Sequence, residues 1–193
     1  MNDSADAFAP AAWIEIARES AAQGFDMPSE NRACSLLRLL VASKPGGRIL
    51  ELGTGTGLAT AWLAAGLGES AQPVSVDVDP KWQSIARRRL GDDPRVEFVL
   101  SDGLDFLRAQ PPASFDLIFA DAMPGKYEGL HDALSRVKVG GFYVGDDMLP
   151  QANWPEGQQA RADGLIAELS ALDGWTTTVL AWGSGLVLAV RRH

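Results

Sequence analysis

The chain is poor in several residue types that commonly build functional sites. It has one cysteine, Cys34, and two histidines among 193 residues. A lone cysteine cannot form an internal disulfide, and a zinc site built from cysteine and histidine needs more ligands than these. No apolar run approaches the roughly 20 residues that a membrane-spanning helix requires. We therefore expect neither a disulfide-stabilised scaffold nor a membrane protein.

Positive charge is also scarce. The chain has 17 Lys and Arg residues against 25 Asp and Glu, a net charge of −8, and its longest basic run is Arg87-Arg88-Arg89. Nucleic-acid binding needs a concentrated positive surface, so it is not expected here. The acidic segment 1–10 lacks the basic start and the apolar core of a signal peptide, which predicts a cytoplasmic protein.

The composition itself is that of an ordinary globular protein. Hydrophobic residues make up 46% of the chain and charged residues 22%, and the length suits one domain. Neither an internal repeat nor a linker interrupts the sequence. Residues 1–193 are therefore predicted to form a single domain, with a helical extension over about residues 1–45.

Short apolar segments alternate with helical patterns, which is typical of a parallel sheet covered by helices on both faces. The patterns predict helices near 11–23, 29–43, 57–67, 81–90, 103–109, 127–137 and 157–172. They predict strands near 48–52, 74–78, 95–100, 115–120, 140–145, 176–182 and 186–191. The last two flank Gly183-Ser184-Gly185 and indicate an antiparallel hairpin. We expect a Rossmann-like, doubly wound α/β fold with a seven-stranded, mostly parallel sheet.

The most informative segment is 49–60, where an apolar run ends in Glu51 and three alternating glycines follow. Glycine permits positive φ and lets backbone N–H groups approach a ligand at a helix N-terminus. The order is G-x-G-x-G, whereas dinucleotide sites need G-x-G-x-x-G. With its preceding acid, the segment resembles motif I of the class I S-adenosylmethionine (SAM) methyltransferases, whose cofactor has a cationic amino-acid end. The alternative is a glycine-rich turn without a ligand. The resemblance implies cofactor contacts by Glu51, Gly53, Gly55, Thr56 and Gly57.

Ligands of open α/β sheets lie beyond the carboxyl ends of the strands. Asp77 and Val78 end the second predicted strand, and a carboxylate there can accept both ribose hydroxyls of an adenosine-containing cofactor. Asp102 follows the third strand. Its carboxylate either meets the adenine amino group, as in methyltransferases, or caps the next helix. We favour the adenine contact, with Gly103 and Leu104 beside the ring.

Three acids follow the fourth and fifth predicted strands, namely Asp121, Asp146 and Asp147. Carboxylates gathered this closely repel and raise each other's pKa unless a cation joins them. Oxygen ligands suit Mg²⁺ or Ca²⁺, so a divalent metal is one interpretation. Cofactor contact, especially by Asp121, and helix capping are the others.

From about Met27 to the C-terminal hairpin, the chain resembles the metal-dependent O-methyltransferases of the catechol and caffeoyl-coenzyme A type. In that family an Asp and an Asp-Asn pair bind the metal, and a Lys assists deprotonation of a hydroxyl. The resemblance implies a metal site at Asp121, Asp146 and Asp147, and catalytic roles for Lys126 and Asp147. Two positions depart from the pattern, because Lys126 lies five residues after Asp121 instead of three, and Asp147 replaces the Asn.

The predicted activity is transfer of a methyl group from SAM to an oxygen of a small-molecule acceptor. Segment 146–155 resembles a distinct bacterial branch of the family, and relatives of this type imply a homodimer. Two alternatives remain, an NAD-type oxidoreductase, which the glycine spacing disfavours, and a non-catalytic SAM-binding scaffold. Trp154 and Trp182 fall near expected rim loops, as candidates for an aromatic wall against the acceptor. The first helix either packs, covers the cofactor or joins two subunits.

Overall fold

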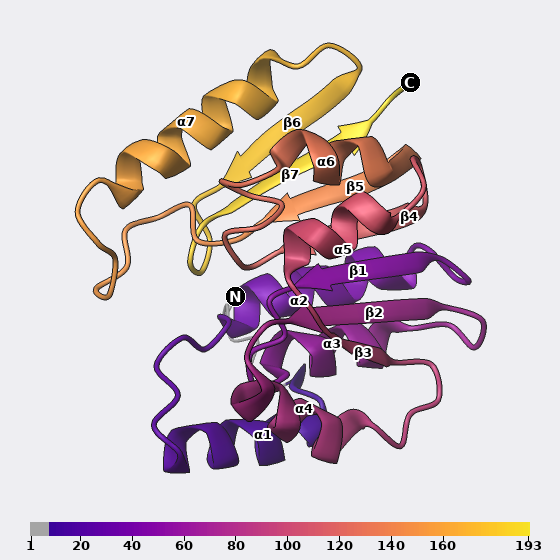
Figure 1. Cartoon of the computed structure of the whole chain (residues 1–193), viewed down its shortest axis with the longest axis vertical. Coiled ribbons are helices and arrows are strands. Elements are labelled where there is room, and N and C mark those ends of the chain that lie inside the picture. The colour runs from indigo at the N-terminus through magenta and orange to yellow at the C-terminus, as the bar shows by residue number, and fades with distance from the viewer. Residues whose placement is uncertain (1–7) are drawn as a thin grey trace.

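A computed structural model describes residues 8–193 and shows one twisted sheet between two layers of helices (Figure 1). The sheet has the strand order β3-β2-β1-β4-β5-β7-β6. Strands β1 to β5 run parallel, whereas β7 is antiparallel to both of its neighbours. The strands are β1 (Arg48–Leu52), β2 (Gln72–Asp77), β3 (Glu97–Leu100), β4 (Phe115–Ala120), β5 (Val137–Gly145), β6 (Trp175–Leu180) and β7 (Leu186–Arg191). The predicted α/β fold with a C-terminal antiparallel hairpin is confirmed.

Helices cover both faces of the sheet. Helices α5, α6 and α7 contribute to the apolar core on one face, and α2, α3 and α4 lie on the other. The helices are α1 (Ala11–Ala22), α2 (Asn31–Ala42), α3 (Leu58–Gly66), α4 (Pro80–Leu90), α5 (Gly103–Ala109), α6 (Leu130–Arg136) and α7 (Gln158–Ala171). Among residues 8–193, none of these helices combines the length and the apolar character that a membrane crossing requires.

Strand β1 shows why its sequence is apolar on both sides. Successive side chains of a strand point to opposite faces. Leu50 and Leu52 enter the core under α5, α6 and α7, while Ile49 enters the core under α2 and α3. All three are buried, as a central parallel strand with helices on both faces requires.

The predicted helix over 127–137 begins three residues late and ends one residue early. The backbone N–H groups of Lys126, Tyr127 and Glu128 all donate to the Met123 carbonyl, which makes a compact turn in place of a first helical turn. Gly129 then takes a left-handed conformation, with φ of 69°, and α6 starts at the next residue. The turn holds the segment after β4 close to the strand tips.

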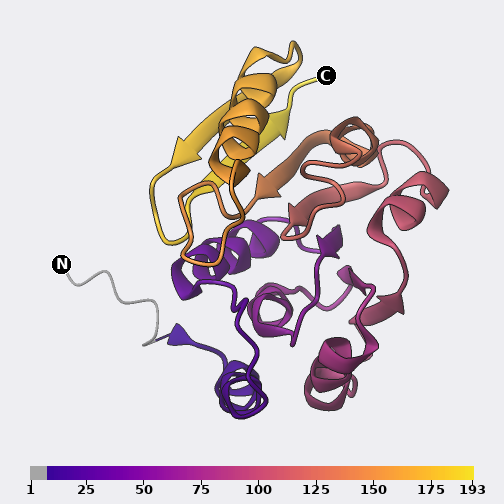
Figure 2. The same cartoon turned by 60° about the vertical axis from the view of Figure 1, so that its left-hand side comes forward.

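The N-terminal part of the described chain consists of α1 and α2, and residues 1–7 of the predicted extension lie outside the described residues. The Glu30 side chain caps α2 by accepting hydrogen bonds from the N–H groups of Arg32 and Ala33. In Figure 2, α1 is the indigo helix at the lower end of the molecule, beside the layer that contains α3 and α4. The segment 23–30 between α1 and α2 therefore passes the carboxyl edge of the sheet.

Candidate active site

The glycine loop after β1 lies at the carboxyl edge of the sheet and needs its glycines. Gly53 has φ of 99°, and a Cβ atom there would lie 2.7 Å from the Asp121 carbonyl oxygen. Gly57 has φ of 93°, and its Cβ would lie 2.7 Å from the Cβ of Ala86 on α4. Side chains at either position would therefore push the loop away from β4 or α4.

Asp77 at the tip of β2 fixes this loop. One of its carboxylate oxygens accepts a hydrogen bond from the N–H of Gly55 at 2.7 Å. The other accepts from the N–H of Asp79 at 2.8 Å. The carboxylate thus joins two neighbouring strand ends while still lining the open space beside them. Its predicted contact with ribose hydroxyls stays a prediction.

Glu51 lies beneath the loop and is buried. One carboxylate oxygen accepts hydrogen bonds from the hydroxyls of Thr60 and Ser75, and the other has no partner among the described residues. Burial raises the pKa of Glu51 to about 7, although both hydroxyls act in the opposite direction. Ser75 is in turn bonded to Thr54, which accepts from the Gln83 amide. Glu51 therefore supports the loop from below.

A cavity of about 970 Å³ opens above this edge. Its walls are the glycine loop, the tips of β2, β4 and β5, the start of α5, the segment 25–30 and the segment 151–161. The structure brings together nine of the residues predicted to form the site, namely Gly53, Gly55, Thr56, Asp77, Val78, Gly103, Asp121, Asp146 and Asp147. Five others do not line it in the described structure, namely Glu51, Gly57, Asp102, Leu104 and Lys126.

Asp102 shows which of its two expected roles the fold uses. Its Oδ1 accepts hydrogen bonds from the N–H groups of Leu104 and Asp105, at 2.8 and 3.0 Å, and so caps α5. The cap brings Gly103 to the cavity wall, where Pro124 leaves no room for a Cβ. The contact of Asp102 with an adenine amino group stays a prediction, and its neighbours Ser101 and Gly103 line the cavity beside it.

The three acids at the tips of β4 and β5 are held differently. Asp121 accepts a hydrogen bond from the Ser29 hydroxyl at 2.9 Å, and burial together with Asp146 and Asp147 raises its pKa. Asp146 is buried and accepts from the Ser184 hydroxyl and from the N–H of Asp147. Burial and the Asp147 charge raise the pKa of Asp146 to about 6.

Asp147 takes a backbone conformation that few residues tolerate. Its φ is 59°, in the left-handed region, where Asp and Asn are enriched among residues other than glycine. Burial raises the pKa of its carboxyl, and the Lys126 charge lowers it. The left-handed residue turns the chain out of β5 and places this carboxylate on the cavity wall.

Lys126 is buried, and its ammonium donates a hydrogen bond of 2.9 Å to the backbone carbonyl of Asp146. It lines a second cavity of about 310 Å³ between the segment 123–130 and α7. Lys126 thus approaches Asp146 and Asp147 from the second cavity and does not line the first. Its predicted role in deprotonation stays a prediction.

The acids do not form a metal site as they stand. Within residues 8–193, no group of three or more His, Cys, Asp and Glu side chains is arranged so that it could hold a metal ion. Oδ1 of Asp146 accepts from the Ser184 hydroxyl and the Asp147 N–H, and Oδ2 of Asp121 accepts from the Ser29 hydroxyl, so these donors take one oxygen of each carboxylate. The Mg²⁺ or Ca²⁺ implied by the resemblance stays a prediction.

Several residues of the site carry no local sequence signal. The Phe25 ring lies so close to Gly55 that a Cβ there would be 3.0 Å from the ring's Cζ, and Phe25 packs edge-on against Trp82. Ser29 reaches Asp121 across 92 residues of chain. Arg161 lies on α7 and lines both cavities. Segment 25–30 mixes apolar and polar residues just before a helix. This mixture is the one local sequence feature of the segment that agrees with its place on the cavity wall.

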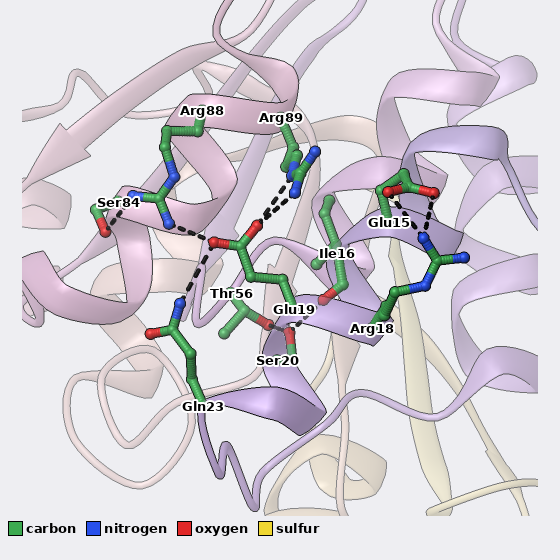
Figure 3. Close-up of polar contacts among 10 residues, drawn as sticks. All are labelled: Glu15, Ile16, Arg18, Glu19, Ser20, Gln23, Thr56, Ser84, Arg88 and Arg89. Atoms are coloured by element: carbon green, nitrogen blue, oxygen red, sulfur yellow. Dashed lines mark hydrogen bonds and ion pairs between the residues drawn. The ribbon is translucent and has the colours of Figure 1, made fainter.

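Helix α1 is tied to the site from the outside (Figure 3). Glu19 accepts hydrogen bonds from the guanidinium groups of Arg88 and Arg89 on α4, and these bonds lower its pKa. The next residue, Ser20, is buried, and its hydroxyl donates a hydrogen bond of 2.8 Å to the Thr56 hydroxyl. The run of three arginines thus includes a docking point for α1, in addition to a solvated face.

Comparisons with known proteins agree with this architecture. A family model described as a methyltransferase domain matches residues 49–141, from β1 into β5. The catechol O-methyltransferase of Mycobacterium tuberculosis is 34% identical over 116 residues, which span 58% of this chain and 53% of that protein. A Mycobacterium leprae protein assigned to the O-methyltransferases is 30% identical over 173 residues, which span 81% of this chain and 75% of its own length.

Solved structures show the same fold over nearly the whole chain. The O-methyltransferase TomG from Streptomyces achromogenes, solved in complex with SAM, has a TM-score of 0.81 at 24% identity and covers 95% of this chain and 90% of its own. The Bacillus cereus O-methyltransferase in complex with SAH has a TM-score of 0.79 at 24% identity, with 93% and 90% coverage. With the glycine loop, the strand-tip acids and these relatives together, the chain belongs to the SAM-dependent O-methyltransferase family.

Proposed function

We propose that the protein moves the sulfonium methyl of SAM to a hydroxyl oxygen of a small-molecule acceptor, with Asp147 as the base that receives the hydroxyl proton. The observation that carries this proposal is the cavity itself. Its wall combines the glycine loop on one side with the carboxylates at the tips of β4 and β5 on the other. SAM carries positive charge on its sulfonium and its ammonium, so an acidic wall suits it better than it suits a dinucleotide pyrophosphate.

The cofactor's orientation follows from the strand order. The ribose would lie at Asp77 on β2, and the adenine would lie at Gly103 between the tips of β2 and β3. The methionine end would then extend over the glycine loop toward Asp121 on β4. The methyl group therefore faces β5, where Asp147 lies, and the acceptor enters from that side.

The reaction is an in-line displacement. The acceptor oxygen forms a bond to the methyl carbon while the bond from that carbon to sulfur breaks, and S-adenosylhomocysteine leaves. The hydroxyl proton passes to the Asp147 carboxylate. Lys126 holds the backbone of the neighbouring Asp146 and so fixes the direction of the turn that carries the base. Most of the rate enhancement comes from holding the two reactants in line.

The proposal is tested by calorimetric SAM binding and by methyl transfer to a panel of phenols and other hydroxylated compounds. Asp147→Asn keeps a residue that tolerates the left-handed backbone but removes the base. We expect unchanged SAM binding and a kcat lowered by about a hundredfold or more. Asp163→Asn, on the exposed side of α7, is the matched control and is expected to behave as wild type.

The outcomes separate the alternatives. SAM binding without transfer to any acceptor would support the non-catalytic scaffold. Full activity of Asp147→Asn would show that another group accepts the proton. Absence of SAM binding would contradict the proposal at its first step, which is binding of the cofactor.

A further inference from the structure

The cavity wall has one feature that the methyl-transfer proposal leaves unused. Seven of the lining residues are acidic, and Arg161 is the only Lys, Arg or His among those that the described structure places on the wall. An anionic ligand group would be repelled along most of this wall. Among the described residues of the wall, the Arg161 guanidinium is therefore the one charged side chain that would attract negative charge.

Arg161 lies on the acceptor side of the site. Asp77 belongs to β2, two strands away from β4, whereas α7 follows β5 and packs beside β6, where the Thr177 hydroxyl donates a hydrogen bond to the Leu169 carbonyl. Figure 1 shows α7 beyond β5, at the opposite end of the sheet from α4. A cofactor whose adenine lies between β2 and β3 and whose methionine end reaches β4 stops short of α7, so Arg161 is available to the second substrate.

The guanidinium has no partner of its own within the described chain. The backbone N–H of Arg161 bonds to Gly157 in α7, but no hydrogen bond or ion pair involves its side chain among residues 8–193. Arg161 is exposed, so its planar donor group is open to a ligand that enters the cavity from solvent, although acids line the same cavity.

Aromatic and amide groups surround the same region. Trp154 is partly buried against the core and lines the cavity, and Gln158 is buried on the first turn of α7. The buried Tyr127 hydroxyl has no hydrogen-bond partner in the described structure, and burial raises its pKa, against smaller opposing effects of Gln158 and the Arg161 charge. A flat indole and a guanidinium in the wall of one cavity fit an aromatic ring that bears a charged substituent.

We infer that Arg161 is a specificity-determining residue that selects an aromatic acceptor carrying a carboxylate as well as the hydroxyl to be methylated. This inference rests on the proposed function. The acceptor hydroxyl lies at Asp147, its ring lies against Trp154, and its carboxylate accepts two parallel hydrogen bonds from the guanidinium. The acids elsewhere on the wall disfavour the reversed orientation, because that orientation would bring the carboxylate against Asp121 and Asp147.

The test compares two probes of the same shape, protocatechuate and its neutral amide. We measure kcat/KM for both, together with their binding to the SAH complex. Wild type is expected to prefer the carboxylate by about tenfold, through KM rather than kcat. Arg161→Gln is expected to abolish the preference and to leave SAM affinity unchanged. Arg108→Gln, which removes an exposed arginine of α5 that does not line the cavity, is expected to keep it.

Three results would overturn the inference. Equal binding of the two probes by wild type would show that the cavity wall does not recognise the carboxylate. A preference retained in Arg161→Gln would show that another group recognises the carboxylate. A fall in SAM affinity in Arg161→Gln would assign the guanidinium to the cofactor. The binding comparison on the SAH complex stands even if neither probe is methylated, so failure of the proposed chemistry is distinguished from failure of the carboxylate preference.

Discussion

The hydroxyl of Ser29 donates a hydrogen bond of 2.9 Å to the carboxylate of Asp121. This bond joins the segment before α2 to the tip of β4 in the middle of the sheet. Both residues line the cavity, so the contact closes one side of the site and orients an acid on the cavity wall.

Ser29→Ala is expected to weaken SAM binding by about fivefold, because one hydrogen bond to a charged group is lost and Asp121 is less firmly held. Calorimetry at neutral pH measures the effect. Ser35→Ala removes a hydroxyl that bonds only within α2, to the carbonyl of Arg32, and is expected to bind SAM as wild type does. Equal affinities for Ser29→Ala and wild type would show that the contact does not order the site.

Gly53→Ala is expected to abolish SAM binding and to destabilise the fold by about 1–3 kcal/mol, because the new Cβ would meet the Asp121 carbonyl at a positive φ. Gly164→Ala is the matched control. A Cβ at Gly164 on α7 meets nothing within 4 Å, so alanine is expected to stabilise that helix by about 0.5–1 kcal/mol. Urea unfolding and SAM titration of both variants check the pair. A Gly53→Ala protein that binds SAM normally would contradict the close approach of the loop to β4.

Glu51 is expected to make stability fall as the pH rises. Burial raises its pKa in the folded protein from an ordinary 4.5 to about 7. Between these values the folded state binds more protons than the unfolded chain, so the free energy of unfolding decreases with increasing pH and is lowest above the folded pKa. The loss between about pH 5 and about pH 8 is at most about 3 kcal/mol.

Glu51→Gln removes one titrating group and is expected to reduce this slope, whereas Asp146, whose pKa is raised to about 6, keeps a smaller slope of the same sign. Urea unfolding of the cofactor-free protein across the pH range measures it. Glu69→Gln, at an exposed loop position, should retain the wild-type slope. A wild-type slope in Glu51→Gln would assign the pH dependence to other groups.

Glu19→Gln is expected to loosen α1 from α4, because the bonds to Arg88 and Arg89 lose their charge. Faster amide exchange in α1 and weaker SAM binding should follow, since α1 also carries Ser20 against Thr56. Glu15→Gln is a close control, because Glu15 pairs with Arg18 of the same helix and does not bridge to α4. Added salt should reduce the difference between Glu19→Gln and wild type, because these charges are exposed. Identical exchange rates in the two variants would contradict the docking role.

Chelation is expected to leave methyl transfer unchanged, because the described structure gathers no set of acids that could hold a metal ion. The measurement compares turnover in EDTA with turnover in excess Mg²⁺, and SAM affinity under both conditions. A clear gain with Mg²⁺ would show that Asp121, Asp146 and Asp147 rearrange around the ion.

The sequence by itself determined the parts of this protein that depend on local pattern. The alternation of strand-like and helix-like apolar patterns predicted the order of the elements. The hydrophobic periods of a helix and a strand are different, so a few residues are enough to distinguish them. The glycines at 53, 55 and 57 predicted a tight loop, because each needs a backbone that other residues avoid. The positions of Asp77, Asp121 and Asp147 at strand ends placed them at one edge, as parallel topology requires.

Only the tertiary structure decided how those residues are used. Glu51 falls beneath the loop because strand alternation and the hydroxyls of Thr60 and Ser75 draw it inward. The Ser29 contact to Asp121 spans 92 residues, and no local pattern encodes such a distance. Arg161 looks in the sequence like any exposed helix residue, and only the position of α7 in the fold puts it at the cavity wall, where it remains exposed. Side chains from distant segments come into contact only after the helices have packed on the sheet, and these contacts shape the cavity.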